Sequence, residues 1–145
     1  MLELLSPAGS PEAVVAAVQN GADAVYMGLG IFNARRGAKN FSDEEFEKAV
    51  RYCRIRGCKV YVTMNTLVGD REMEQAAELA RRVSDLGADA ILVQDIGLLS
   101  VLKRIVPDIP LHASTQMSIH DLAGVEAAAE MGLTRAVLAR ELSFE

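Results

Sequence analysis

The chain has 145 residues, 50% of them apolar, and carries a formal net charge of −5 at neutral pH. This length suffices for one sizeable hydrophobic core and is too short for two full domains. The acidic balance excludes a protein whose overall field attracts nucleic acid or an anionic membrane surface.

No stretch of the sequence is long and apolar enough for a membrane span, and no charged and then apolar signal segment opens the chain. Cys53 and Cys58 are its two cysteines, which are too few for a disulfide framework. We therefore expect a cytoplasmic protein with free thiols and no membrane partner.

Short apolar segments alternate with segments of helical periodicity along the whole chain. Strands are expected at residues 2–5, 24–28, 60–65, 91–94, 111–114 and 136–139. Three of the intervening helices begin at recognisable caps, which are Ser10 before Pro11, Ser42 paired with Glu45 in a capping box, and Asp70. The next two helices are expected at residues 98–106 and 122–131.

A glycine followed by a short apolar strand recurs as a unit. Gly21 and Gly87 each precede an Ala-Asp-Ala sequence and a strand, and looser copies begin at Gly57 and Gly132. Glycine suits the left-handed residue that ends a helix, because it has no Cβ to clash there. The recurring helix-then-strand unit indicates parallel strands joined by helical crossovers.

Strict alternation of strands and helices predicts an α/β fold. A (β/α)8 TIM-type barrel needs about 250 residues. We interpret residues 1–145 as a single segment that forms the N-terminal three quarters of such a barrel, with about six strands, incomplete at its C-terminus. An open doubly wound sheet is the alternative, but no glycine-rich dinucleotide turn follows the first strand.

Alternate residues of a strand face opposite sides of the sheet. In the third expected strand, the apolar residues Val60, Val62 and Met64 should lie under the helices. The alternating set then points into the barrel, and it comprises Tyr61, Thr63, Asn65, Leu92, Gln94, His112, Ser114, Gln116, Leu138 and Arg140.

Chemistry in such a barrel takes place at the carboxyl ends of the strands. Amides, hydroxyls and a guanidinium gather there, which suits a small anionic substrate or cosubstrate. The candidate substrate-binding residues are Asn65, Gln94, Ser114, Gln116, Arg140, Glu141 and Arg35, the last from a basic segment without acidic neighbours. We assign no catalytic residue and no metal ligand. The alternative role for each of the seven candidate residues is to form hydrogen bonds with backbone atoms at the strand ends.

Other reactive side chains favour structural roles. We expect Glu3 to point inward and pair with a lysine or arginine, and His112 to be a hydrogen-bonded core histidine. Cys53 and Cys58 are expected to be packed thiols, since two cysteines cannot supply the four thiolates of an iron–sulfur cluster. No serine elbow or histidine–carboxylate pair indicates a protease.

Six segments carry a resemblance to a known family: residues 3–9, 21–26, 32–35, 40–41, 112–116 and 138–143. In their order and spacing they resemble the peptidase U32 family, also called collagenase-like proteases, over essentially the whole chain. The resemblance implies a barrel of this type in the bacterial cytoplasm.

The resemblance implies proteolysis in some members, and hydroxylation of tRNA or rRNA or a step of ubiquinone synthesis in others. The latter bind a four-iron–four-sulfur cluster through later cysteines, and the RNA hydroxylases use prephenate. Those ligands would lie beyond residue 145. We therefore expect no cofactor within this segment, and a 4Fe-4S cluster is implied for the full-length protein alone.

Three functions remain open. The family name assigns a U32 peptidase, and this is our main prediction. The side chains favour the hydroxylation alternative, because no protease machinery is visible. The resemblance implies that this reaction is iron–sulfur-dependent, prephenate-using hydroxylation of tRNA or rRNA, or hydroxylation of a ubiquinone-pathway substrate. A non-catalytic barrel segment that binds a partner is the third. We expect an enzyme whose contacts with RNA or peptide lie in further regions, so that the segment alone is inactive.

Overall fold

The strands form one parallel sheet in sequence order. The computed structural model describes residues 2–34 and 41–143. Within these residues, six strands pair in the order β1-β2-β3-β4-β5-β6, and every pair is parallel. The strands are β1 (Leu5–Pro7), β2 (Ala24–Gly28), β3 (Lys59–Met64), β4 (Ala90–Val93), β5 (Leu111–Ala113) and β6 (Arg135–Ala136).

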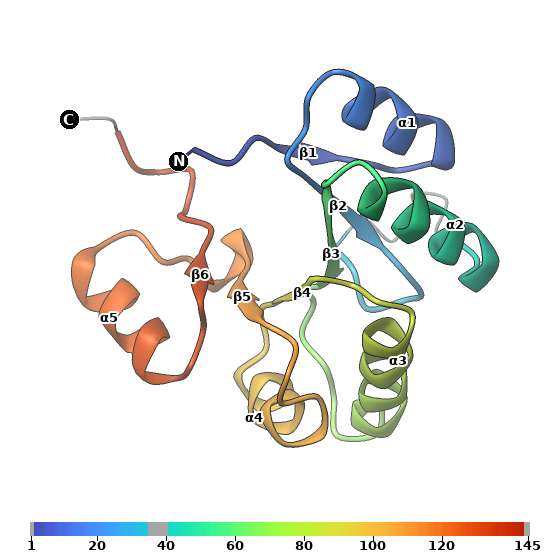
Figure 1. The fold of residues 1–145 in the computed structure, drawn as a ribbon. Coiled ribbons are helices and arrows are strands. Elements are labelled where there is room, and N and C mark those ends of the chain that lie inside the picture. The colour runs from blue at the N-terminus through green and yellow to red at the C-terminus, as the bar shows by residue number, and fades with distance from the viewer. Residues whose placement is uncertain (1, 35–40, 144–145) are drawn as a thin grey trace.

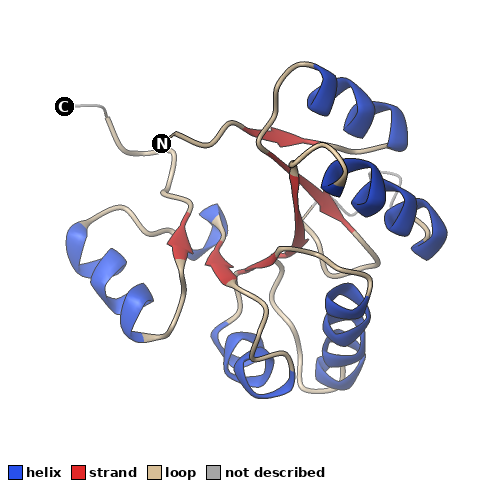
Figure 2. Ribbon diagram, in the orientation of Figure 1, coloured by secondary structure: helices blue, strands red, loops and turns tan. Residues whose placement is uncertain are grey.

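The helices lie on the outer side of the curved sheet. They are α1 (Pro11–Gln19), α2 (Asp43–Arg54), α3 (Met73–Asp85), α4 (Ile96–Ile105) and α5 (Leu122–Glu130), with a short 3-10 turn, η1 (Thr115–Met117). Figure 1 shows the strands curving around a common centre, and Figure 2 shows the same arrangement by element type. The expected TIM-type α/β architecture is therefore confirmed. None of the described helices is long and apolar enough to cross a bilayer.

Two of the three expected caps hold their helices. Ser10 accepts a hydrogen bond from the Ala13 amide at 3.2 Å, and Ser42 and Glu45 form the full capping box. The prediction for Asp70 is wrong. Helix α3 follows Glu72, whose carboxylate accepts from the Gly69 amide at 3.0 Å, so residues 69–72 form a turn ahead of the helix. Helix α4 begins two residues earlier than expected, because its cap is Asp95.

The helix-ending glycines adopt the backbone that the sequence predicts. Gly21, Gly57, Gly87 and Gly132 have φ values of +87°, +70°, +91° and +87°. At Gly87 a Cβ would also lie 2.6 Å from the Arg54 guanidinium, which donates to the Gly87 carbonyl. Each turn therefore brings the chain from an outer helix back to the sheet without strain.

Two apolar clusters lie on opposite faces of the sheet. The larger cluster lies between the strands and the helices and includes Val60, Val62 and Met64. The smaller cluster fills the inside of the curve with Ala24, Tyr61, Ala90 and Leu92, against which Leu5, Tyr26 and Val137 pack. The side-chain alternation expected for the third and fourth strands is thereby confirmed.

The expected bounds of the last strand and the inward position of Leu138 are wrong. Strand β6 is Arg135–Ala136 rather than 136–139, and Arg135 is in register with the inward-facing His112. Parallel partners share a face, so Arg135 and then Val137 point inward. Leu138 is 46% exposed instead.

A charged network lies inside the curve near the amino ends of the strands. The Glu3 carboxylate accepts hydrogen bonds from Arg135, from the Tyr61 hydroxyl at 2.9 Å and from Lys59 at 3.2 Å. The Tyr61 ring packs edge-on against His112 at 5.0 Å between centroids. Glu3 is therefore the paired inward carboxylate that we expected, and it links the segment before β1 to β3 and β6.

This network shifts the protonation of its members. The hydrogen bond from Arg135 is the largest cause that lowers the pKa of Glu3 to about 2, while burial raises the pKa of Tyr61 to about 12. Burial also lowers the pKa of His112 to about 4, so the imidazole is neutral at pH 7. The interior therefore holds Glu3 and Arg135 as ions beside neutral His112 and Tyr61.

Substituting Glu3→Gln should remove part of the acid sensitivity of the fold. A lowered carboxyl pKa stabilises the folded state above the unfolded pKa, and this contribution is lost as the pH falls from about 4.5 to about 2. We expect Glu3→Gln to lower the free energy of unfolding by about 1 to 2 kcal/mol at pH 7 and to reduce the decline below pH 4.5. Urea unfolding across this pH range measures both.

The matched control is Glu44→Gln, which breaks a surface pair with Lys48 whose side chains are 79% and 74% exposed. This change should leave stability nearly unaltered. An unchanged acid response in Glu3→Gln would contradict the assignment of Glu3 as the linking carboxylate.

Substituting Cys53→Ala should cost packing energy. Cys53 is fully buried on α2, and burial raises the pKa of its thiol to about 12. We expect a loss of about 1 to 2 kcal/mol in unfolding free energy, and a smaller loss for Cys58→Ala, which lies at the start of β3. Equilibrium unfolding of both variants tests this order, and a larger loss for Cys58→Ala would show that the order is wrong.

Candidate functional site

A cavity of about 250 Å³ lies at the carboxyl ends of the strands. Its walls combine inner-face residues of β2, β3 and β4 with residues from the segments after β1, β2, β5 and β6. The lining includes Tyr26, Asn33, Thr63, Asn65, Leu92, Ser114, Thr115, Gln116, Val137 and Arg140. Four of the seven predicted substrate-binding residues thus line one cavity: Asn65, Ser114, Gln116 and Arg140.

Asn65 joins two loops across the floor of the cavity. It directly follows β3 and is 9% exposed. Its Oδ1 accepts from the Ala34 amide at 3.0 Å, and its Nδ2 donates to Ser114 Oγ at 3.1 Å and to Gln116 Oε1 at 3.0 Å. The Ser114 hydroxyl also donates to Gln116 Oε1. These four hydrogen bonds connect the loop after β2, the end of β3 and the turn after β5.

The 3-10 turn η1 presents Gln116 to the cavity. Strand β5 ends at Ala113, and Ser114 caps the turn that follows. Ser118 ends the turn in the left-handed region with φ +57°. Gln116 was expected to continue the alternation of the fifth strand. It reaches the cavity from this turn instead.

The loop after β2 forms another wall. Asn33 is 2% exposed and donates from Nδ2 to the Gly30 carbonyl at 2.9 Å. A Cβ on Gly28 would lie 2.8 Å from Asn33 Cγ, so glycine is required where the loop leaves the strand. Tyr26 and Asn33 are lining residues that the sequence analysis did not single out. Their signals were the inner-face register of Tyr26 with Tyr61 and the family-like segment 32–35.

Arg140 is the one charged side chain among the described residues that line the cavity. The chain leaves β6 after Ala136, and the Ala139 amide donates to the Ile119 carbonyl at 2.8 Å, which holds the segment against the start of the α5 region. No carboxylate of the described residues forms an ion pair with Arg140. Arg140 is also exposed.

The other three predicted residues are not brought to the cavity wall. Gln94 is half-buried just after β4, where the chain turns into α4, and it does not line the cavity. Glu141 is exposed and also does not line it. Arg35 lies outside the described residues.

The described side chains do not form a nucleophile and base pair. Ser114 is hydrogen-bonded to the side-chain amides of Asn65 and Gln116. His120 Nδ1 lies 2.9 Å from the Ser118 carbonyl oxygen. His112 packs inside the barrel against Tyr61 rather than against a serine. Within the described residues, no serine therefore has the histidine that acyl-transfer catalysis requires.

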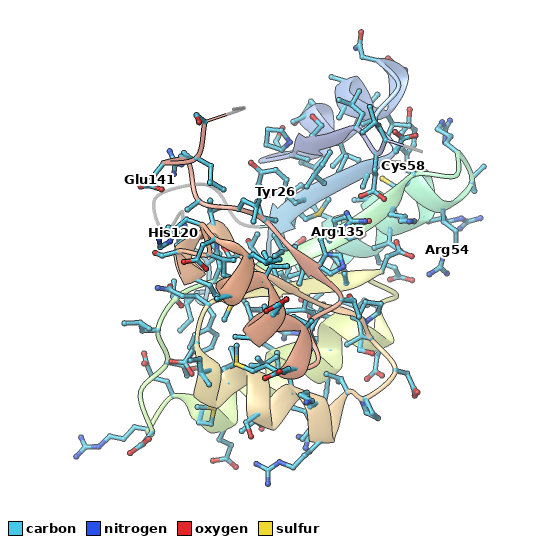
Figure 3. All side chains as sticks on the ribbon, turned by 90° about the vertical axis from the view of Figure 1, so that its left-hand side faces the viewer. Tyr26, Arg54, Cys58, His120, Arg135 and Glu141 are labelled. Carbon is cyan, nitrogen blue, oxygen red and sulfur yellow. The ribbon has the colours of Figure 1, made fainter. Side chains whose placement is uncertain are left out.

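The thiols of this chain do not fit an iron–sulfur cluster. Cys53 and Cys58 are buried, and burial raises the pKa of both, which disfavours the thiolate form that binds iron. Figure 3 shows Cys58 toward one end of the barrel and Glu141 and His120 toward the other. The described residues also contain no cluster of three or more potential metal ligands.

Comparison with known proteins identifies relatives over nearly the whole chain. Over 99% of its own length, the chain is 40% identical to the 23S rRNA 5-hydroxycytidine C2501 synthase of Escherichia coli. Over 97% of its own length, it is 36% identical to tRNA hydroxylation protein P1 of Bacillus subtilis. It is 31% identical to a collagenase of Porphyromonas gingivalis over 99%. The chain spans 21%, 33% and 34% of the lengths of these three relatives, respectively.

A solved structure of a U32 peptidase has the same fold. It superposes with a TM-score of 0.76 at 18% identity, covering 95% of this chain and 58% of that one. The sequence pattern of Peptidase family U32 matches residues 9–145. The chain therefore belongs to peptidase family U32.

Proposed function

We propose that this protein takes part in the hydroxylation of RNA, and that its cavity binds a small anionic cosubstrate, for which prephenate is the candidate. The observation that carries the proposal is Arg140, a guanidinium without an acidic neighbour on the described cavity wall. A guanidinium beside a side-chain amide can hold a carboxylate through paired, charge-assisted hydrogen bonds.

Two observations favour hydroxylation over proteolysis. The relatives with the higher identities carry names of rRNA and tRNA hydroxylation, whereas the relative named collagenase is less similar. Ser114 bonds to amides and has no histidine partner among the described residues. The peptidase that we first expected from the family name is therefore the second candidate, favoured by that name and by the collagenase-named relative.

The cavity residues divide the work of binding. Arg140 holds the carboxylate, and Gln116 orients it with an amide donor. Leu92, Val137 and the Tyr26 ring offer an apolar surface for the rest of the ligand. The chain carries a net negative charge and spans only 21% and 33% of the two relatives named for RNA hydroxylation. The proposal therefore assigns no contact with RNA to the described cavity.

Substituting Arg140→Lys should weaken binding of prephenate without destabilising the fold. Lysine keeps the charge but offers a point donor in place of a planar pair, and a lost charge-assisted hydrogen bond corresponds to about tenfold or more in affinity. Arg140 is exposed and has no described ion pair, so the melting temperature should stay the same. Calorimetric titration and thermal unfolding measure the two quantities.

The matched control is Arg104→Lys, an exposed arginine in the last turn of α4. It should change neither affinity nor stability. If Arg140→Lys binds prephenate like the unaltered protein, or loses affinity only in step with stability, Arg140 does not anchor the ligand.

Inactivating the gene should remove a hydroxylated nucleoside from cellular RNA. Mass spectrometry of digested rRNA and tRNA from the deletion strain should show the loss, the intact gene should restore it, and the Arg140→Lys gene should restore less of it because the cosubstrate binds more weakly. Unchanged nucleosides, together with cleavage of gelatin by the purified protein that Ser114→Ala abolishes, would support the peptidase instead.

A further inference from the structure

The network around Asn65 has a direction that one backbone group determines. The Ala34 amide can only donate a hydrogen bond, and its partner at 3.0 Å is the side chain of Asn65. The oxygen of that side chain must therefore face Ala34. Its Nδ2 group is left facing the opposite way, toward β5 and the turn η1.

The same constraint passes to Gln116. Asn65 Nδ2 carries two N–H donors and directs them at Ser114 Oγ and Gln116 Oε1, at 3.1 Å and 3.0 Å. The Ser114 hydroxyl accepts from Asn65 and from the Gln116 backbone amide, and donates to Gln116 Oε1. Because Gln116 Oε1 faces two donors, the carbonyl end of its side chain is held at the floor.

The amino end of the Gln116 side chain is the end that remains for the cavity. Gln116 lines the cavity and is half-buried, and its Nε2 group donates to no atom of the described residues. Thr63, which also lines the cavity, directs its hydroxyl proton at the Met27 carbonyl at 3.2 Å instead. The Gln116 amide protons and the Arg140 guanidinium are therefore two donor groups of the polar wall, to which Tyr26, Asn33 and Thr115 also belong.

We propose that Asn65 is a positioning residue, which relays the polarity of the Ala34 amide to Gln116 so that the cavity presents hydrogen-bond donors and selects carboxylate or carbonyl oxygens over ammonium groups. This specificity rests on the proposed function, since it concerns the same anion site. An amide that could rotate freely would offer an oxygen as readily as a nitrogen and would discriminate less between acceptors and donors.

Substituting Asn65→Asp tests the relay, because the two side chains have nearly the same shape. A carboxylate at position 65 can accept from Ala34 and Ser114 but cannot donate to Gln116. Gln116 should then turn its amino group to the floor and its oxygen to the cavity. We expect the affinity for prephenate, measured by calorimetric titration, to fall about tenfold or more.

A double-mutant cycle separates this relay from the added charge. The negative charge that Asn65→Asp introduces repels the ligand in both the unaltered background and the Gln116→Met background. Its effect on prephenate affinity therefore cancels when the losses caused by Asn65→Asp in the two backgrounds are compared. We expect the loss of prephenate affinity to be several-fold smaller in the Gln116→Met protein. Equal losses in both proteins would overturn the relay.

A measurement without ligand tests the orientation itself. In protein labelled with ¹⁵N at glutamine, the side-chain protons of Gln116, assigned with Gln116→Met, should exchange rapidly with water and slow markedly in Asn65→Asp. Equal exchange in the two proteins would overturn the proposal. If the unaltered protein binds no prephenate, the proposed function fails, while the exchange measurement still decides the relay.

A second variant covers the case in which Asn65→Asp does not fold. Gln116→Glu keeps an acceptor toward Asn65 and Ser114 and turns a carboxylate oxygen to the cavity in place of the amino group. It should fold normally and lose prephenate affinity by about tenfold or more. Retained affinity with an unchanged melting temperature would contradict the donor-lined cavity.

Discussion

Parallel hydrogen bonding between neighbouring strands determines which side chains share the inside of the curve. The register places Gly28, Thr63, Leu92, His112 and Arg135 side by side, from β2 to β6. Because every strand runs in the same direction, the residues that follow these five positions along the chain meet at the carboxyl end of the barrel. The cavity depends on this arrangement, since its polar groups come from segments far apart in the sequence.

The two ends of the barrel interior differ in how their charges are balanced. At the amino end, Glu3 is held between Arg135 and Lys59, and its pKa is lowered to about 2. At the carboxyl end, Arg140 has no described carboxylate partner, and the side-chain amides of Asn65 and Gln116, which line the same cavity, are hydrogen-bonded to each other. The charges at the first end are paired within the fold, whereas the guanidinium at the second end has no described carboxylate partner. This contrast supports the proposed anion site.

Sequence patterns predicted the site best where the strands are regular. Asn65 and Ser114 directly follow β3 and β5, so the alternation of those strands places them correctly. Gln94 directly follows β4 in the same way and still does not line the cavity, because the chain turns there into α4. Leu138 is exposed because β6 ends at Ala136. The prediction for Glu141 rests on its place at the strand end and not on the alternation. Strand alternation does not predict the place of Asn33, because it depends on a loop packed over Gly28. That residues 1–145 form one incomplete barrel segment stays a prediction.

In the proposed function, this cavity receives an anion at Arg140 and at the amino group of Gln116. A high-resolution crystal structure of the protein with prephenate tests it most directly. We expect a ligand carboxylate on the Arg140 guanidinium, with Gln116 Nε2 donating to a ligand oxygen and Asn65 Oδ1 still accepting from the Ala34 amide. Prephenate bound elsewhere, or a Gln116 side chain that turns its oxygen toward the ligand, would contradict the account.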